Sequence, residues 1–219
     1  MSKQKVDRGY DQIALDAQYN NQLAAPAFIN AGAMFVSLSF GRLPDETIDT
    51  MVSQVRGAVA WLSHNVGNYG GHSDRIFLSG HSSGAHLASQ CLNADWAGRF
   101  KCPADIIKGA TFISGLGDLE PIRLSYRNAL LKLDEPAVQR LSLMHQRPTV
   151  SCPLLTAYES GDTAEFQRQT REVAAYWRNH KCHAEVVEVA GCGHYDILFE
   201  LADSQSSLFR STLALMDLM

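Results

Sequence analysis

The chain has 219 residues, 46% of them hydrophobic, which is enough to bury one sizeable core. Its 19 lysine and arginine residues are balanced by 23 aspartate and glutamate residues without long charged runs, so no basic face invites nucleic acid or anionic lipid. These values predict a single domain over residues 1–219 that acts on a small molecule.

Compartment and cofactors are indicated mainly by what the sequence lacks. The first ten residues contain no apolar core of a signal peptide, and no apolar run approaches the ~20 residues of a membrane span, so we expect a cytoplasmic protein. The cysteines are odd in number and contain no C-x-x-C pair, which favours reduced thiols. No Cys/His pairs recur at ligand spacing, so neither a zinc site nor any other cofactor is predicted. The cysteines are Cys91, Cys102, Cys152, Cys182 and Cys192.

Apolar runs typical of strands alternate along the chain with amphipathic segments typical of helices. Most of these runs are almost continuously apolar, as expected for strands covered on both faces. The alternation predicts an α/β fold with a mainly parallel sheet between two helical layers. The predicted strands are 33–40, 75–80, 109–115, 153–159 and 184–190.

Helical spacing of apolar residues predicts a crossover helix over 45–65, with Asp45 as a candidate N-cap. Residues 163–180 repeat this pattern, and a last helix is predicted over 205–218. The stretch 116–150 contains three prolines and one short helical patch near 136–142. A connection of this length is usually functional, for example as a lid over a substrate.

The tract Gly80-His81-Ser82-Ser83-Gly84 fits the motif G-x-S-x-G, between a predicted strand and a predicted helix over about 83–92. Small residues two positions to either side of Ser82 let strand and helix pass closely. Such a turn lifts the Ser82 hydroxyl out of the sheet edge, and the amide of Ser83 becomes a donor to an oxyanion. Ser82 is therefore the candidate nucleophile.

A serine nucleophile needs a base and an orienting acid. His194 follows the strand 184–190, and Asp162 follows the strand 153–159, which gives the order serine, acid, histidine at three strand ends. Asp162 is also a candidate N-cap for the next helix, and Glu159 is a rival acid at the same strand end.

Two further histidines flank the motif. His81 should point away from the nucleophile in a packing or turn role, and His86 should make a polar contact in the core.

Several tracts carry a family resemblance: YDQIALDAQYNNQ, RIFLSGHSSGAHLA, ISGLGDLEPIRLSYRN, GDTAEFQRQT and GCGHYD. Together they resemble the kynurenine formamidase (arylformamidase) branch of the α/β-hydrolases, over residues 7–22 and 25–219. The resemblance implies that Ser82, His194 and Asp162 form a triad that hydrolyses an N-formyl aryl amide or a carboxylic ester. Within 116–130, Leu116, Leu119, Tyr126 and Asn128 are candidates for an apolar wall and a polar handle that bind the substrate.

The sequence departs from this family at one point. Family members carry a His-Gly-Gly-aromatic tract that completes the oxyanion hole, and it is absent here, together with on the order of 60 residues and their N-terminal strands. An oxyanion hole reduced to the Ser83 amide would lose roughly 3 to 4 kcal/mol of transition-state stabilisation. The sheet would also have a gap unless 33–40 pairs with 75–80 or a second chain in a homodimer fills it. The alternative function is a catalytically impaired protein that binds a small ligand or partner.

Overall fold

The computed structural model describes residues 23–219, so the tract 7–22 that carries part of the resemblance lies outside the described residues. Its sheet has four parallel strands in the order β1-β2-β3-β4. The strands confirm four of the predicted runs, with ends shifted by at most two residues. They are β1 (Ile76–His81), β2 (Ile107–Ile113), β3 (Leu154–Glu159) and β4 (Ala184–Val189).

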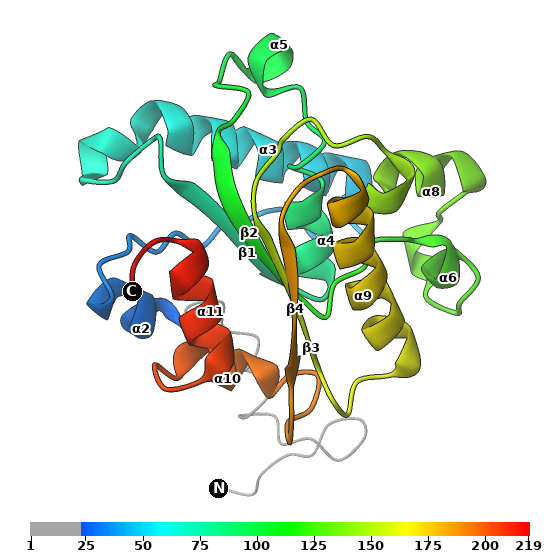
Figure 1. The fold of residues 1–219 in the computed structure, drawn as a ribbon. Helices are drawn as coiled ribbons and strands as arrows, with labels where there is room; N and C mark the ends of the chain where they lie inside the picture. Colours follow the sequence, from blue (N-terminus) through cyan, green and yellow to red (C-terminus); the bar gives the residue numbers. More distant parts are fainter. Residues whose placement is uncertain (1–22) are drawn as a thin grey trace, which may run out of the picture.

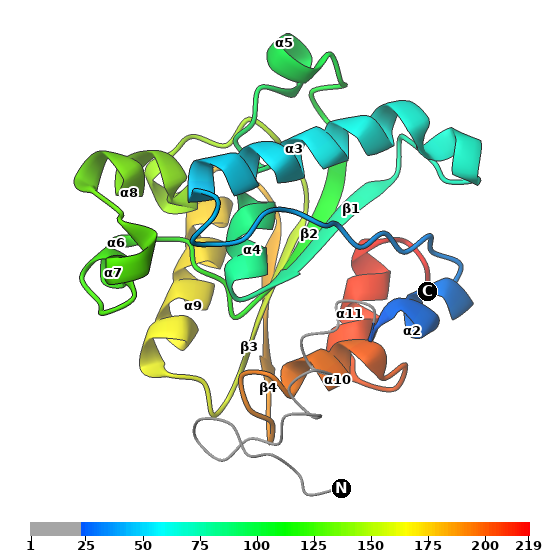
Figure 2. The ribbon, with the colours of Figure 1, turned by 180° about the vertical axis from the view of Figure 1, so that it is seen from behind.

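Helices cover both faces of the sheet, as Figures 1 and 2 show from opposite sides. One face packs against α3 (Ile48–Asn65), α4 (Ser83–Ser89) and α9 (Ala164–Asn179). The other packs against α2 (Ala25–Asn30), α10 (Ile197–Ala202) and α11 (Ser207–Leu215). Two apolar clusters fill these layers, so the predicted three-layer α/β sandwich is confirmed.

The central strands are almost entirely buried because both of their faces meet a helical layer. Every residue of β3 is buried, and in β2 all but Lys108 are. The outer strands β1 and β4 are only partly covered.

The strand predicted at 33–40 is wrong, because this stretch forms no ladder with any described strand. Its side chains are mostly covered and exposed in turn, but the covered ones pack against two different helical layers. Ala33 and Phe35 pack with the apolar cluster that contains residues of α2, α10 and α11. Leu38 and Phe40 pack with the other cluster, which contains residues of α3, α4 and α9. The stretch thus crosses from one layer to the other on its way to α3 (Figure 2), and β1 has a described strand on one side only.

Hydroxyl caps fix where the long helices begin. Thr47 caps α3 by accepting from the amide of Thr50 at 3.1 Å, so the prediction of Asp45 as the cap is wrong. Thr163, not Asp162, caps α9, which leaves the Asp162 carboxylate for other contacts. Ser206 caps α11 by accepting from the amide of Phe209 at 3.0 Å.

The connection 116–150 is more helical than predicted. The patch expected near 136–142 is α8 (Glu135–Leu141), and it is preceded by α6 (Glu120–Arg123) and α7 (Asn128–Leu131). Both extra helices have four residues, too few to show a periodic pattern. The remaining short elements are η2 (Val66–Tyr69), α5 (Trp96–Phe100) and η3 (Leu143–His145).

None of the helices within residues 23–219 combines the length and the apolar character needed to cross a bilayer.

The turn from β1 into α4 brings two stretches of backbone into close approach. A Cβ atom added at Gly80 would lie 2.6 Å from the carbonyl carbon and oxygen of Gly84 and 2.7 Å from the Cα of Ala85. A Cβ atom at Gly84 would meet nothing within 4 Å. Of the two motif glycines, only Gly80 is therefore required by space.

We expect Gly80→Ala to destabilise the protein by about 1 to 3 kcal/mol, because backbone atoms must move to admit the methyl group. Gly84→Ala is the matched control, and it should be neutral or stabilising by up to about 1 kcal/mol. Urea unfolding of both variants measures these free energies. Equal destabilisation by the two substitutions would show that the contact at Gly80 does not set the turn.

The helix α2 supplies a second test of the fold. Phe28 is 5% exposed and its ring lies 5.0 Å from that of Phe209, whereas the adjacent Ile29 is 57% exposed. Phe28→Ala should lower the free energy of unfolding by about 3 to 5 kcal/mol, and Ile29→Ala by less than about 0.5 kcal/mol. A small effect at Phe28 in urea unfolding would mean that α2 does not pack on the sheet in solution.

Candidate active site

Ser82 occupies the sharp turn between β1 and α4. Its backbone has φ 54° and ψ −121°, in the strained region that a non-glycine residue adopts only when its surroundings impose it. The amide of Ser82 donates to the carbonyl of Ile113 on β2 at 2.8 Å, which ties the turn to the neighbouring strand. The hydroxyl oxygen lies 3.1 Å from Nε2 of His194, in the loop after β4.

The other ring nitrogen of His194 faces a buried carboxylate. Nδ1 of His194 lies 2.9 Å from Oδ1 of Asp162, which is 7% exposed in the turn after β3. Oδ2 of Asp162 accepts a hydrogen bond of 2.5 Å from the hydroxyl of Ser114, at the end of β2. The structure thus links Ser82, His194 and Asp162 by hydrogen-bond contacts into one chain, which we call the relay. Both carboxylate oxygens of Asp162 take part in such contacts.

Ser114 is a site residue that the sequence reasoning missed. It has φ 45° and is fully buried. The signal available was its position at the end of a predicted strand, beside the strand that leads to Ser82.

Glu159, the rival acid, is close to the relay but does not contact its histidine by a hydrogen bond. Its side chain is fully buried, and neither carboxylate oxygen accepts a hydrogen bond from the described part of the chain. Burial raises the pKa of Glu159, the nearby Asp162 raises it further, and the adjacent amides and His194 oppose the shift. The geometry therefore favours Asp162 as the partner of His194.

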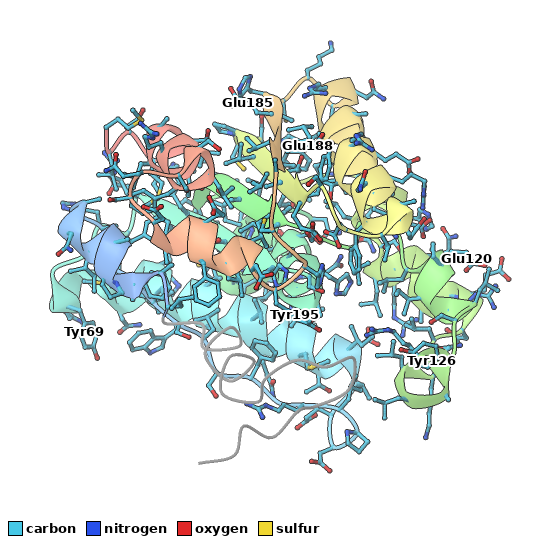
Figure 3. The ribbon with its side chains drawn as sticks, turned by 90° about the horizontal axis from the view of Figure 1, so that it is seen from below. Tyr69, Glu120, Tyr126, Glu185, Glu188 and Tyr195 are labelled. Carbon is cyan, nitrogen blue, oxygen red and sulfur yellow. The ribbon has the colours of Figure 1, made fainter. Side chains whose placement is uncertain are left out.

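Aromatic rings hold the imidazole of His194 on several sides. The ring centroids of Phe166, His81 and Tyr195 lie 4.5, 4.6 and 5.2 Å from that of His194. Figure 3 shows Tyr195 from the side where the strands end. These contacts restrict the ring to the orientation that faces both Ser82 and Asp162.

The two histidines flanking Ser82 have different surroundings. His81 packs against His194 with its ring tilted by 47°, and burial, followed by the charge of His194, lowers the pKa of His81 to about 4. His86 is buried, and its Nε2 lies 2.7 Å from the carbonyl of Leu141, which is the polar core contact expected for it. Burial also lowers the pKa of His86.

The amide of Ser83 is the first of α4, in the turn of the helix whose amides have no partner within the helix. It belongs to the residue that follows Ser82, which is the position of one oxyanion donor in the G-x-S-x-G turn.

The four residues predicted to bind substrate have different surroundings. Leu116 lines a small, partly open pocket with Ala85 of α4, and Leu119 is buried in the core at 3% exposure. The side chain of Asn128 pairs with both backbone groups of Leu133, which closes the loop after α7. Tyr126 is 81% exposed on the α6–α7 side of the molecule (Figure 3). Leu119 and Asn128 thus have structural roles.

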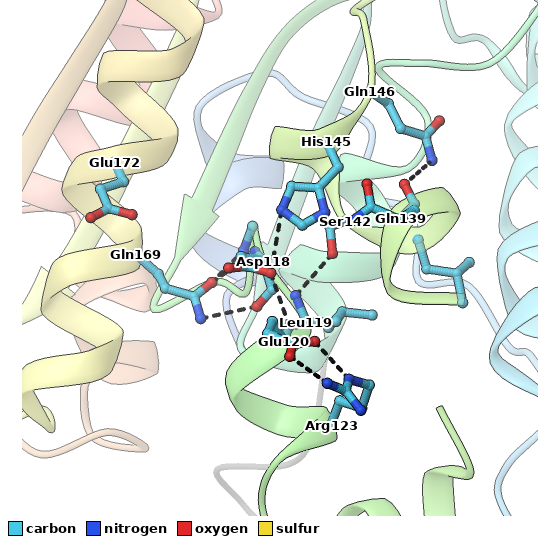
Figure 4. Close-up of polar contacts among 12 residues, drawn as sticks. Asp118, Leu119, Glu120, Arg123, Gln139, Ser142, His145, Gln146, Gln169 and Glu172 are labelled. Atoms are coloured by element: carbon cyan, nitrogen blue, oxygen red, sulfur yellow. Dashed lines mark hydrogen bonds and ion pairs between the residues drawn. The ribbon is translucent and has the colours of Figure 1, made fainter. Parts of the chain in front are cut away.

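The α6–α8 segment is anchored to the rest of the fold by a set of polar contacts (Figure 4). Oε1 of Gln169 on α9 accepts from the amides of Gly117 and Asp118 at 2.8 and 2.9 Å, and its Nε2 donates to the carbonyl of Asp118 at 3.0 Å. The amide of Leu119 donates to the Ser142 hydroxyl at 2.9 Å. The start of the segment is therefore fixed in place beside the strand ends.

The donor atoms of Glu159, Asp162 and His194 also form the only group within residues 23–219 that could hold a metal ion. One donor atom from each residue lies within 4.8 Å of the others.

Comparisons with known proteins agree on the family and the fold. A family model described as BD-FAE matches residues 10–95. The chain is 31% identical over 210 residues to a kynurenine formamidase of Danio rerio, covering 94% of this chain and 69% of that protein. It is 30% identical to a kynurenine formamidase of Salmo salar, covering 95% of this chain and 70% of that protein.

Solved structures give the same architecture at lower identity. An esterase from Pyrobaculum calidifontis matches with a TM-score of 0.74 at 15% identity, covering 92% of this chain and 72% of that one. Esterase B from Lactobacillus rhamnosis matches with a TM-score of 0.62 at 14% identity, and this chain spans 65% of its length. By its sequence relatives, the chain belongs to the kynurenine formamidase family of α/β-hydrolases.

Proposed function

We propose that this protein is a serine hydrolase whose nucleophile is Ser82. The observation that carries the proposal is the relay in which Nε2 of His194 lies 3.1 Å from the Ser82 hydroxyl while Nδ1 lies 2.9 Å from Asp162. Hydrogen-bond contact on both sides of one imidazole is the arrangement that proton transfer from serine requires.

In the proposed reaction, the Ser82 oxygen attacks the substrate carbonyl carbon and its proton passes to Nε2 of His194. Asp162 holds the imidazole in the tautomer that accepts this proton and stabilises the imidazolium that forms. The imidazolium then protonates the leaving amine or alcohol, which leaves an acyl group on Ser82. Water activated by His194 attacks the acyl-enzyme and regenerates the free serine.

The substrate class we propose is an N-formyl aryl amide, with formate released from a formyl-serine. Support comes from the relatives, which are named kynurenine formamidases, and carboxylic esters are the second class because the structural neighbours include esterases. The formyl group is the smallest acyl group.

The oxyanion donor of the proposal is the Ser83 amide. A His-Gly-Gly tract does not occur in the sequence, so a second donor of that kind is not supplied by these 219 residues. The loss of one oxyanion donor typically lowers the rate about 10² to 10³-fold. This departure favours the second candidate function, a ligand-binding protein with impaired catalysis.

His81 does not compete with His194 as the base. With a pKa of about 4, its ring is neutral near pH 7, and its buried Nε2 contacts no described hydrogen-bond partner. Because the neighbouring His81 ring is neutral, it does not oppose the positive charge that forms on His194 during the reaction.

A fluorophosphonate probe tests the nucleophile directly. The folded wild type should form a single adduct on Ser82, located by mass spectrometry, and Ser82→Ala should form none. Ser79→Ala, at an exposed serine three residues earlier on β1, is the matched control and should be labelled as the wild type is. An unlabelled Ser82 in the folded wild type would contradict the hydrolase and leave the ligand-binding candidate.

Substrate class is tested on the same samples with N-formylkynurenine and a p-nitrophenyl ester. We expect hydrolysis of the formamide in the wild type and its loss in Ser82→Ala. Turnover of the ester alone would assign the protein to the esterases.

The low pKa of His81 predicts a stability that depends on pH. In the unfolded chain the residue binds a proton below about pH 6.5, but in the folded protein only below about pH 4. The unfolded state therefore binds more protons in this window, and the free energy of unfolding should fall as the pH falls from 6.5 to 4. In urea unfolding, His81→Gln should reduce this slope. An unchanged slope would mean that His81 titrates normally.

A further inference from the structure

The geometry points to a zinc-binding site on the acid side of the relay, formed by Glu159, Asp162 and His194, whose occupation blocks proton transfer from Ser82. One donor atom from each of these residues lies within 4.8 Å of the others. Two carboxylate oxygens and an imidazole nitrogen form a mixed set that suits zinc better than magnesium or calcium.

The second observation is the state of Glu159. Its side chain is fully buried at the end of β3, and both oxygens lack a hydrogen-bond partner within the described residues. A buried carboxylate left in this state beside another carboxylate is costly, and a cation that binds both offsets that cost. The unpartnered oxygens are thus available as ligands.

The surroundings hold the other two ligands in place. The Ser114 hydroxyl donates to Oδ2 of Asp162 at 2.5 Å, which orients the carboxylate so that Oδ1 faces His194. The rings of Phe166 and His81 lie within 4.6 Å of the imidazole. Such supporting contacts are what keep metal ligands oriented.

The three ligands must change their spacing to accept the ion. Donor atoms that share a tetrahedral zinc ion lie roughly 3.3 Å apart, given bond lengths of about 2.0 Å. Asp162 and His194 lie closer than this, at 2.9 Å, so the ion must replace their hydrogen bond and move them apart, while Glu159 starts within 4.8 Å of both. The His194 side chain is 20% exposed and that of Asp162 only 1%, so the ion would have to pass the imidazole to reach the carboxylates.

Binding would inactivate the relay through the imidazole tautomer. In the free protein the Nδ1–H of His194 donates a hydrogen bond to Asp162, which leaves Nε2 to accept the proton of Ser82. When zinc occupies Nδ1, the imidazole proton lies on Nε2, and any proton on Glu159 is released to solvent. Nε2 can then only donate to the Ser82 oxygen.

Calorimetric titration with zinc chloride tests the site without reference to activity. The wild type should bind one zinc ion per chain at this site, and Glu159→Gln, which removes one ligand but keeps the shape, should bind at least about tenfold more weakly. Binding to Glu159→Gln as tight as to the wild type would overturn the inference. Circular dichroism establishes that each variant is folded.

Two control variants separate this site from other zinc ligands. Glu185→Gln breaks an exposed pair in which His183 lies 3.1 Å from Glu185, and it should not change the binding. Cys192→Ser removes a half-buried thiol near Glu159, and it should not change it either. Loss of binding in Cys192→Ser but not in Glu159→Gln would assign the ion to the thiol and overturn the inference.

X-ray absorption at the zinc edge gives an answer from the wild type alone, should Glu159→Gln fail to fold. We expect nitrogen and oxygen neighbours at about 2.0 Å with an imidazole contribution, and sulfur at about 2.3 Å would overturn the site.

Labelling of Ser82 by the fluorophosphonate then tests the consequence, and this step alone rests on the proposed function. Zinc should slow labelling of the wild type at least tenfold, in a manner reversed by a chelator, and it should have much less effect on Glu159→Gln. Labelling unaffected by bound zinc would overturn the block on proton transfer. Absence of labelling without zinc would instead contradict the proposed hydrolase and leave the zinc site to be judged by calorimetry.

Discussion

The close approach of β1 to the first turn of α4 at Gly80 is the constraint on which the candidate site depends. Backbone atoms of Gly84 and Ala85 lie close to Gly80, Ser82 turns the chain with a positive φ, and its hydroxyl lies 3.1 Å from Nε2 of His194. The hydrogen bond from the Ser82 amide to Ile113 ties this strained turn to β2. The reactive atom is thus positioned by backbone contacts.

Each member of the relay comes from a different strand end, so the parallel sheet brings together residues far apart in the chain. Ser82 follows β1, Ser114 follows β2, Asp162 follows β3 and His194 follows β4. In each case the preceding strand is anchored in one of the two apolar clusters. The rigidity of the two layers is therefore transmitted to the hydroxyl, carboxylate and imidazole groups, as catalytic geometry needs.

Much of this arrangement could be predicted from the sequence, since buried parallel strands and the turn at Ser82 have strong local signals. The stretch 33–40 misled the prediction because its alternating side chains face two different layers, which local periodicity cannot distinguish from a strand. Ser114 and the isolation of Glu159 could not be predicted, because both depend on contacts across neighbouring strands. The choice between Asp162 and Glu159 likewise needed the geometry of the turn.

The sequential strand order has a consequence for how the site forms during folding. Because every crossover joins neighbouring strands, each new strand adds to an edge that already exists. His194, however, lies beyond the last strand of the sheet, so the relay is incomplete until β4 has docked. During synthesis, the serine turn can therefore form well before its base arrives, and reactivity at Ser82 reports completion of the whole sheet.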